Sequence, residues 1–484
     1  MEYSTIIYQN RVILVETATY VIVEQVVLLV NNQELSSIAA QPLLALSSWR
    51  IEPEIDGERQ HFLCQRLAIV PDVQKGIYPF RDVRLSRADV EWLLANHEQK
   101  RGPVDWSDIE QRDRQSLDLR GADLRHVNLQ SLPLAGLRGG LTKEEWNSST
   151  LEQHLMAGIH LERAALSEAL LQGAVLRGTY LNETRFRGTH LEEAVLFQAH
   201  LEGAYLRTAH LEGANMESAH LEGAYLRKAY LVGTDLRDAF FDSATNLEKI
   251  VLADAKGRCA LLADVHWGDV NLSVIDWQQV KRLGDENLAR IPQRQRGSIQ
   301  DKQRWLNNYR AAIRANRQLA NSMRAQGINE EAIPFAYRAQ VLQRRVLWRH
   351  MLWGRQAVSS VDGYVHDGLR QTMRELWQRM LSGGSYIFSW FLDILAGYGY
   401  KPGRSLLMYV LMITIFAIAY HLLGSLSLKE AIIFSITSFH GRGFLPGPFT
   451  LRSPVTAFAA IEAVVGLFIE ISFIATFTQR FFGR

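Results

Sequence analysis

HLEGAYLRTAHLEGANMESAHLEGAYLRKAYL, residues 200–231, repeats a unit of five residues. An apolar residue, Leu or Met, returns at every fifth position, and an alanine stands two residues before it. A period of five matches neither the 3.6-residue period of a helix nor the alternation of a strand. A coil with four sides of five residues fits the pattern, because each side then turns one bulky and one small side chain inward. This stretch therefore predicts a square coil whose turns stack on one another.

The same period runs without a miss from Leu161 to Phe241, with Ala or Thr at every small position. Four sides close a coil of about twenty residues, and such coils stack through backbone hydrogen bonds at about 4.8 Å. The interior of so narrow a coil has room for one bulky side chain per side. Burial is predicted for six residues that test the register: Ala204, Leu206, Ala214, Met216, Ala224 and Leu226.

The A-x-L-x-x pattern resembles that of the pentapeptide-repeat family, whose members form a right-handed quadrilateral β-helix. The resemblance covers roughly residues 113–280, starts weakly at LDLRGADLRHVNL, and is interrupted by a helical insertion near 138–158. Val265 with Trp267 and Val270 with Leu272 keep the phase toward the end. The family pattern implies the fold and says little about the function.

The regions on either side of the repeat lack its five-residue period and have other sequence patterns. Residues 1–110 are interpreted as a small α/β domain of unknown role, with strands in the β-branched runs and a helix after the capping-box spacing of Ser86 and Asp89. Residues 281–382 are interpreted as a basic helical linker, broken at Gly327 and before Pro334. From Lys281 to Arg404 there are 21 Lys and Arg against 9 Asp and Glu, an excess of 12 positive charges.

Residues 383–484 are predicted to be a membrane domain. An aromatic segment beside basic residues suits a membrane interface, and spans of about 405–424 and 455–477 are long enough to cross a bilayer. Basic residues crowd the N-terminal side of the first span and follow the end of the second. The positive-inside rule therefore places both termini in the cytoplasm and 425–454 outside. The chain is accordingly predicted to be a multi-pass protein of the cytoplasmic (inner) membrane, in contact with membrane lipids.

Residues 426–439, LSLKEAIIFSITSF, are apolar but too short to cross, and a glycine-rich stretch follows them. Span, short re-entrant helix, Gly-x-Gly loop and span together resemble the two-transmembrane pore-loop module of potassium-channel-like proteins. The resemblance covers roughly residues 400–484, with the pore loop at 428–448. It implies a filter in one run of residues: Thr437, Ser438, Phe439, His440, Gly441, Arg442 and Gly443.

This sequence departs from the potassium-channel pattern, because Arg442 stands where that family has an aromatic residue between two glycines, and Phe439 and His440 replace Thr and Val. In that family the residue between the glycines points away from the pore axis. A charge behind the loop needs a partner, so an Arg442–Glu462 salt bridge is predicted to brace a weakly selective cation path, with Glu430 as the alternative partner. Gly466 is either a gating hinge or a glycine of close helix packing.

The remaining patterns concern stacked histidines, surface charge and enzyme motifs. His160, His200 and His220 share a face with Tyr180, and this imidazole ladder is read as a solvated product of duplication rather than a metal site or pH sensor. Residues 161–245 carry 12 Asp and Glu against 8 Lys and Arg, too mild a negative charge for DNA mimicry. No phosphate loop, zinc motif or nucleophile elbow occurs, so we expect no enzyme activity, cofactor, metal or nucleic acid.

Two functions from different classes stay open. The first is a subunit of a tetrameric ion channel, since one pore loop cannot enclose a path, with the cytoplasmic β-helix as a sensor or docking platform for a protein partner. The second is a membrane-anchored interaction scaffold whose β-helix binds a protein and whose spans only anchor and oligomerise it. Ion flux through the purified protein in liposomes separates them.

Overall fold

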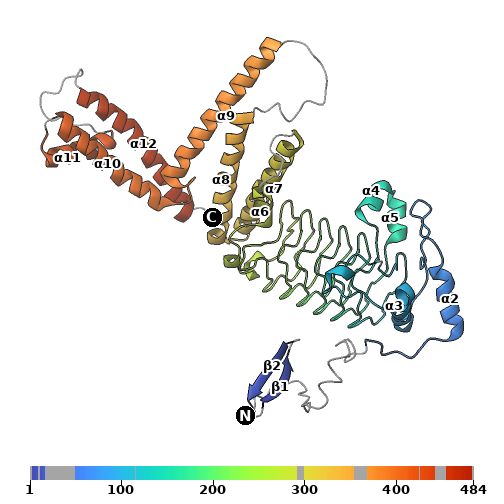
Figure 1. Cartoon of the computed structure of the whole chain (residues 1–484). Coiled ribbons are helices and arrows are strands. Elements are labelled where there is room, and N and C mark those ends of the chain that lie inside the picture. The colour runs from blue at the N-terminus through green and yellow to red at the C-terminus, as the bar shows by residue number, and fades with distance from the viewer. Residues whose placement is uncertain are drawn as a thin grey trace.

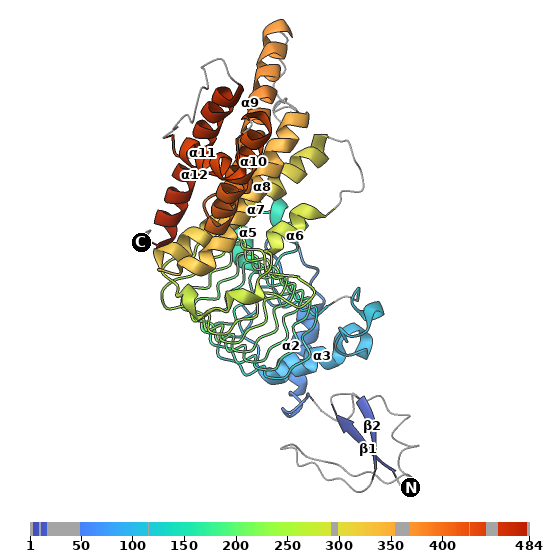
Figure 2. The same ribbon diagram turned by 90° about the vertical axis from the view of Figure 1, so that its left-hand side faces the viewer.

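The computed structural model describes residues 3–8, 11–16, 49–114, 116–291, 299–353, 368–424, 426–441 and 454–481. A stack of square coils forms the centre of the molecule, and helices lie at both of its ends (Figure 1). After the turn of view in Figure 2, the helices α7 to α12 all rise from one end of the stack. The chain is thus divided into a coil stack and a helical part.

The coil stack follows the predicted twenty-residue turn. Parallel bridges join residues twenty apart, such as His200 with His220 and Tyr205 with Tyr225. The Leu201 N–H donates to the His220 carbonyl at 2.8 Å, and the His220 N–H donates to the Ala199 carbonyl at 3.0 Å. The pairing consists of single bridges, because each side turns a corner before a longer strand can form. All six residues chosen to test the register are fully buried, which confirms the prediction.

Local chemistry explains how each side is built. Gly203 has φ +67°, and the third residue of most other sides is also left-handed, a conformation that glycine adopts without strain. Where threonine takes the small inward position, its hydroxyl is buried and needs an acceptor. Thr184 Oγ1 donates to the Leu161 carbonyl at 2.7 Å, and Thr189 donates to Leu166 in the same way. These bonds tie one coil to the coil beneath it.

The insertion near 138–158 is helical, as predicted. After it the chain rejoins the stack, where Asp123 pairs with His160 and Arg138 pairs with Val175. The two inserted helices both begin with capping boxes, from Thr142 and from Thr150. They are α4 (Lys143–Ser148) and α5 (Leu151–Ala157).

The N-terminal end of the stack is closed by chain that the sequence analysis assigned to a separate domain. The predicted capping box of Ser86 and Asp89 is present and begins a helix whose Val90 and Leu93 share the core of the coils. Arg84 pairs with Asp123 of the first coil. The hydrophobic core is therefore continuous across residue 110, where the predicted N-terminal domain ended. The elements are β1 (Tyr3–Tyr8), β2 (Arg11–Glu16), α2 (Gly57–Leu67), α3 (Arg87–Lys100) and η2 (Ile109–Gln111).

The β-branched run at 12–15 lies in β2, which pairs with β1 in an antiparallel hairpin. The run at 21–30 lies outside the described residues. Helix α2 was not foreseen, and its Leu63 joins the core of the coil stack. The α/β character predicted for this end thus rests on one hairpin and two helices.

Helices also close the C-terminal end of the stack. Val270 and Leu272 are buried in the phase that the sequence predicted, and Leu319 and Phe335 from two long helices pack onto the same core. The linker breaks at Gly327 (φ +78°) as predicted, but the break expected directly before Pro334 is wrong, because Pro334 lies inside the continuous helix that begins at Asn329. The elements are η3 (Leu272–Val274), η4 (Trp277–Gln279), α6 (Gly284–Arg290), α7 (Ile299–Ala325) and α8 (Asn329–Trp353).

The last four helices form the predicted membrane part. In Figure 1, α9 shares a lower end with α10 and α12 and diverges from them upward. Helix α9 already begins at Gly368, so the boundary drawn between linker and membrane domain at residue 382 falls inside a continuous helix. The elements are α9 (Gly368–Ala396), α10 (Pro402–Gly424), α11 (Leu428–Phe439) and α12 (Pro454–Phe481).

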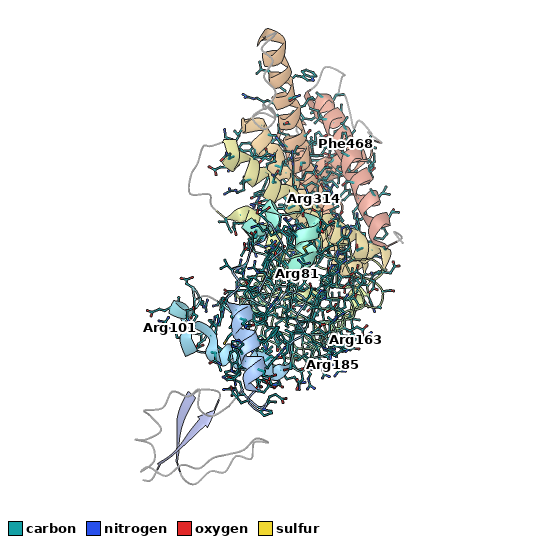
Figure 3. The ribbon with its side chains drawn as sticks, turned by 90° about the vertical axis from the view of Figure 1, so that its right-hand side faces the viewer. Arg81, Arg101, Arg163, Arg185, Arg314 and Phe468 are labelled. Atoms are coloured by element: carbon teal, nitrogen blue, oxygen red, sulfur yellow. The ribbon has the colours of Figure 1, made fainter. Side chains whose placement is uncertain are left out.

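Two of these helices are long and apolar enough to cross a membrane. They are Pro402–Gly424, with mean hydropathy 2.2, and Val455–Ala475, with mean hydropathy 2.1. Most of their large apolar side chains face outward, as Phe468 does on α12, whereas arginines such as Arg163 and Arg185 cover the coil face (Figure 3). Such extended apolar surface is typical of a segment that contacts lipid or another subunit.

Candidate functional site

The short helix α11 packs against both candidate spans, α10 and α12. It begins at Ser427, whose hydroxyl and Glu430 form a capping box, so the helix start is fixed by the local sequence. Its buried residues, Ala431, Phe434, Ser435 and Ser438, follow the spacing of one helix face. That face lies against the two longer helices.

Phe439, His440 and Gly441, from the middle of the predicted filter run, lie at the end of α11. Phe439 is buried, in a cluster with Leu395 of α9 and Ile469 of α12. His440 follows it, with Nδ1 at 2.8 Å from the Ile436 carbonyl and Nε2 at 3.3 Å from the Glu470 carboxylate. Gly441 has φ +67° and ends the helix in the left-handed region. The structure thus orients Phe439 by packing and His440 by contacts with Ile436 and Glu470.

The hydroxyls that precede them turn toward the protein. Thr437 Oγ1 lies 3.0 Å from the Ile433 carbonyl and 2.9 Å from the Phe434 carbonyl of its own helix, and Ser438 is buried. Arg442 and Gly443 lie outside the described residues, so the structure does not place the Gly-Arg-Gly centre of the predicted filter.

Glu462 is fully buried in the middle of the three helices. Its Oε2 accepts a hydrogen bond from the Tyr420 hydroxyl at 2.6 Å, and its Oε1 accepts one from Ser435 Oγ at 2.5 Å. A carboxylate in an apolar environment requires such donors. One side chain of α12 therefore ties together α10 and α11. The predicted salt bridge with Arg442 involves a residue that is not described and stays a prediction.

Sequence reasoning named Glu462 but missed Tyr420. A tyrosine within an apolar span carries a hydroxyl that must find a partner when buried. Tyr420 is 1% exposed, and its ring also meets Phe434 edge-on at 4.7 Å. The sequence signal that could have found Tyr420 is the presence of two polar groups in neighbouring apolar spans. The acid of Glu462 needs a hydrogen-bond donor when buried, and the phenol of Tyr420 needs an acceptor.

Gly466 lies where α12 passes closest to the end of α11. A Cβ atom added there would stand 2.1 Å from the carbonyl oxygen of Phe439 and 3.0 Å from its ring. Helix α12 is continuous across this position. Of the two interpretations of Gly466, this geometry supports close packing, and whether the helix also bends there during gating stays a prediction.

A polar junction around Asp393 joins the linker to the candidate spans. The carboxylate accepts hydrogen bonds from Tyr337 at 2.9 Å and from Arg344 at 2.7 Å, both on α8. Arg404, at the start of α10, donates to the same carboxylate at 3.1 Å. Asp393 itself belongs to α9. Three helices thus meet at one nearly buried carboxylate, which the sequence analysis did not single out.

The histidine ladders on the coil stack are present. His160, Tyr180, His200 and His220 stack in one row with centroid distances of 4.6, 5.4 and 5.2 Å. Each of these histidines has its Nδ1 within 3.4 Å of the glutamate two residues on. In the row on the opposite face, the hydrogen bond that His190 donates to Glu192 raises the pKa of His190, against the opposing effect of burial.

Two sets of ladder residues stand close enough to suggest a metal site, one formed by His190, Glu192 and His210. The two imidazoles stack at 4.7 Å with planes 5° apart. An ion bound by a histidine lies close to the plane of its ring, so parallel rings at this separation cannot share an ion without turning. For this set the geometry favours stacking and His–Glu hydrogen bonds over metal binding.

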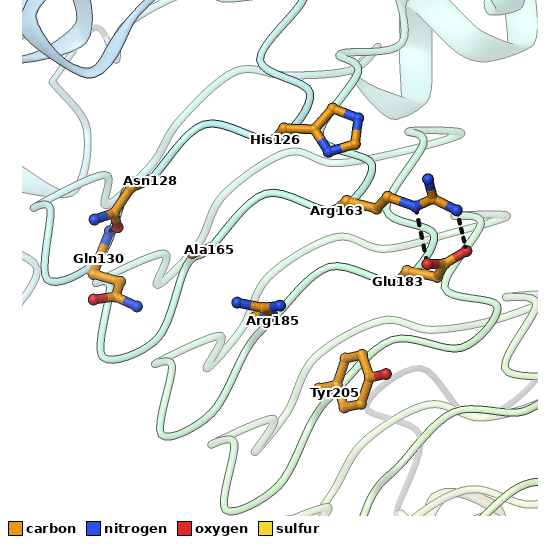
Figure 4. A pocket seen from close by; sticks show the side chains of 8 residues that line it. All are labelled: His126, Asn128, Gln130, Arg163, Ala165, Glu183, Arg185 and Tyr205. Carbon is orange, nitrogen blue, oxygen red and sulfur yellow. Dashed lines mark hydrogen bonds and ion pairs between the residues drawn. The ribbon is translucent and has the colours of Figure 1, made fainter.

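A shallow groove of about 500 Å³ lies on another face of the coils (Figure 4). Arg163 and Glu183 form a two-bonded ion pair at its edge, with both N–O distances at 2.9 Å. Arg185 and Tyr205 line its floor and are exposed. This groove is open to solvent and is not an enclosed pocket.

The comparisons with known proteins concern the coil stack. The family model described as pentapeptide repeats matches residues 159–198 and 204–242 in eight copies. A pentapeptide repeat protein from Nostoc Pcc 7120 is 33% identical and covers 18% of this chain and 72% of its own, with a TM-score of 0.18. One from the cyanobacterium Cyanothece 51142 is 29% identical and covers 30% and 87%, with a TM-score of 0.14. The search of curated proteins found no match.

The coil stack therefore carries the repeats of the pentapeptide-repeat family, within residues 159–198 and 204–242. More particularly, the chain is a pentapeptide-repeat protein that also carries two helices able to span a membrane by their length and composition. No family match covers the pore-like region. The low TM-scores carry no argument about the arrangement of the remaining helices.

Proposed function

We propose that this protein is a subunit of a membrane ion channel with a cytoplasmic pentapeptide-repeat domain. The observation that carries the proposal is α11, a twelve-residue apolar helix that packs against two candidate spans and is followed, after His440, by the left-handed Gly441. A membrane anchor needs no such helix, whereas a pore loop does. The subunit is proposed to form a homo-tetramer, because one loop cannot surround a path.

The buried Glu462 supports the same proposal. An ionisable group inside a span marks a functional position more often than a structural one. Here its carboxylate holds α11 against α10 and α12 through Ser435 and Tyr420. A rigid pore helix is what a loop at its end requires in order to keep a fixed constriction.

The permeant ion is proposed to be a cation. Arg442 would lie behind the loop, braced by Glu462 or Glu430, so that its charge would not face the path. Both termini are proposed to lie in the cytoplasm. A cysteine at Ser425→Cys is then expected to react with an impermeant reagent from outside, and one at Gln479→Cys is not. The reverse labelling would contradict the topology.

The test is ion flux through the purified full chain in liposomes. Gradients of potassium and of chloride are imposed separately, and we expect flux under the cation gradient and reversal potentials that follow the cation. Arg442→Gln is expected to destabilise the loop and lower the flux without converting an anion path to a cation path. Arg207→Gln, on an exposed position of the coils, is the matched control and should conduct as the wild type does. Reversal potentials that track chloride would contradict the proposal.

The alternative of a membrane-anchored scaffold has its own supporting observation. The coil stack presents exposed rings, Tyr205 and Tyr225, which stack at 5.1 Å beside the groove at Arg185. Exposed aromatic side chains are frequent at protein interfaces. A reconstituted oligomer that passes no ion, and that retains a protein partner only while Tyr205 and Tyr225 are intact, would establish this alternative in place of the channel.

A further inference from the structure

A pocket of about 270 Å³ lies between α8 and α9, close to the junction at Asp393. Helix α8 contributes an aliphatic, a ring and two guanidinium groups, and α9 contributes two rings. The Trp348 and Tyr386 rings, which both line it, are in contact, with centroids 5.0 Å apart and planes 43° apart. The residues that line it are Val341, Arg344, Arg345, Trp348, Tyr386 and Trp390.

The two arginines of this pocket differ in their partners. Arg344 donates to Asp393 at 2.7 Å and lies over the Tyr398 ring, so its position is fixed and its charge is balanced. Arg345 is exposed, and among the residues that the structure describes no hydrogen bond or ion pair engages its guanidinium. The pocket therefore offers one uncompensated positive charge beside one that is already anchored.

The surface around the pocket is apolar. On α9, Ile387, Phe388 and Phe391 are 68%, 60% and 41% exposed, and Trp390 at the pocket is 55% exposed. The apolar surface continues onto the start of α10, where Leu406 and Leu407 face outward. Large apolar side chains that are exposed in a continuous group are uncommon on soluble proteins. Tryptophan beside arginine is instead the composition of a membrane interface.

The position along the chain agrees with this environment. Trp390 lies one helical turn before Asp393, and Asp393 bonds to Arg404 at the start of the first candidate span. The pocket is therefore placed beside the end of that span, which the positive-inside rule assigns to the cytoplasm. There the anionic headgroups of the inner leaflet would lie within reach of Arg345.

We infer that the pocket between α8 and α9 binds the phosphate of an anionic phospholipid, with Arg345 as the phosphate ligand and Trp348, Tyr386 and Trp390 around the glycerol and upper acyl chain. A guanidinium binds phosphate oxygens through paired N–H groups. The apolar surface of α9 would receive the acyl chains. This inference rests on the membrane attachment in the proposed function, but not on ion conduction.

The site links lipid to the rest of the chain. Arg344 lies next to Arg345 and bonds Asp393, which in turn bonds Arg404 of α10. A lipid bound at Arg345 would hold α8 and α9 together above this junction. It would thereby stabilise the connection between the coil stack and the candidate spans.

The test measures the melting temperature of the full chain in a neutral detergent, with no ion gradient, so it is independent of conduction. Dioleoyl phosphatidylglycerol is expected to raise the melting temperature with increasing concentration, as a ligand of the folded state does. Arg345→Gln is expected to weaken the apparent affinity about fivefold. Arg310→Gln, on an exposed position of α7, is the matched control and should respond as the wild type does.

Three further additions decide the source and class of the ligand. Dioleoyl phosphatidylcholine should give no comparable rise, and an equal rise would show a nonspecific acyl effect and overturn the inference. Glycerol phosphate should act only weakly, and an equal shift would assign the site to free phosphate instead. A short DNA duplex that stabilises the wild type more than the lipid does would also overturn it, as would an unchanged lipid response in both Arg345→Gln and Trp390→Ala.

Discussion

The coil stack and the helices α9 to α12 are stabilised in different ways. In the coils, every fifth residue and its small neighbour are buried by a rule that repeats each side, as Leu206 and Ala204 illustrate. In the helices, most apolar side chains are exposed, and the buried positions depend on a few contacts between distant segments, such as Glu462 with Tyr420. The coil is thus tolerant of change outside and intolerant inside, whereas the helices depend on single polar and glycine positions.

Overpacking the coil should have the largest effect. Ala214 is fully buried beside Met216 and Leu211, and the cross-section is fixed by the hydrogen bonds between coils. Ala214→Leu is expected to lower the free energy of unfolding by about 1–3 kcal/mol or more. Hydrogen exchange of the coil amides in the full chain measures it. Arg207→Leu places the same side chain on the outside and should change the stability by less than about 0.5 kcal/mol; equal losses would show that the coil interior is not the limiting feature.

Closing the space at Gly466 should have the next largest effect. Gly466→Ala forces a Cβ against the Phe439 carbonyl, so the spans must shift at a cost of about 2 kcal/mol. The thermal stability of the protein in detergent reports this loss, and Gly403→Ala, where a Cβ meets no atom, is the control. Altered currents with unchanged thermal stability would instead favour the hinge interpretation.

Removing one hydroxyl from the buried carboxylate should have a smaller effect. Tyr420→Phe leaves Glu462 Oε2 without its donor, and an unsatisfied buried acceptor costs about 1 kcal/mol or somewhat more. The measurement is again thermal stability in detergent. Tyr409→Phe removes a hydroxyl from the same helix, from a ring that packs edge-on against Phe439 and His440, and is expected to have little effect. If both variants behave alike, Glu462 does not organise the three helices.

The histidine ladders should give the smallest effect, through pH. Glu192 and Glu202 raise the folded-state pKa of His190 and of His200, chiefly by hydrogen bonds. The resulting stability is complete below the unfolded-state pKa of about 6.5 and is lost as the pH rises through the folded-state pKa. Coil protection against hydrogen exchange should therefore decline slightly between about pH 6 and 8. The double variant Glu192→Gln with Glu202→Gln should flatten this dependence; an unchanged slope would refute the coupling.

Residues whose role follows from local spacing were predictable. The inward positions of the coils, the capping box at Ser86 and the helical insertion all depend on side chains within a few residues of one another. The short helix at 428–439 also followed from the length and apolar character of that stretch, whereas its re-entrant position stays a prediction. Asp393 was not predictable, because its partners Tyr337 and Arg404 come from two other helices and only packing brings them together.

The sequence by itself determined the coil, because a five-residue period places each bulky side chain inward whatever the rest of the chain does. It also determined which helices are apolar enough to cross a membrane. Only the tertiary structure decided that the chain before residue 110 closes the coil stack, that Gly466 lies against Phe439, and that Glu462 bonds to Tyr420. The physical reason is the range of the interactions: the coil repeats contacts that recur every twenty residues, whereas the helical site is made from single contacts between segments whose approach no local pattern encodes.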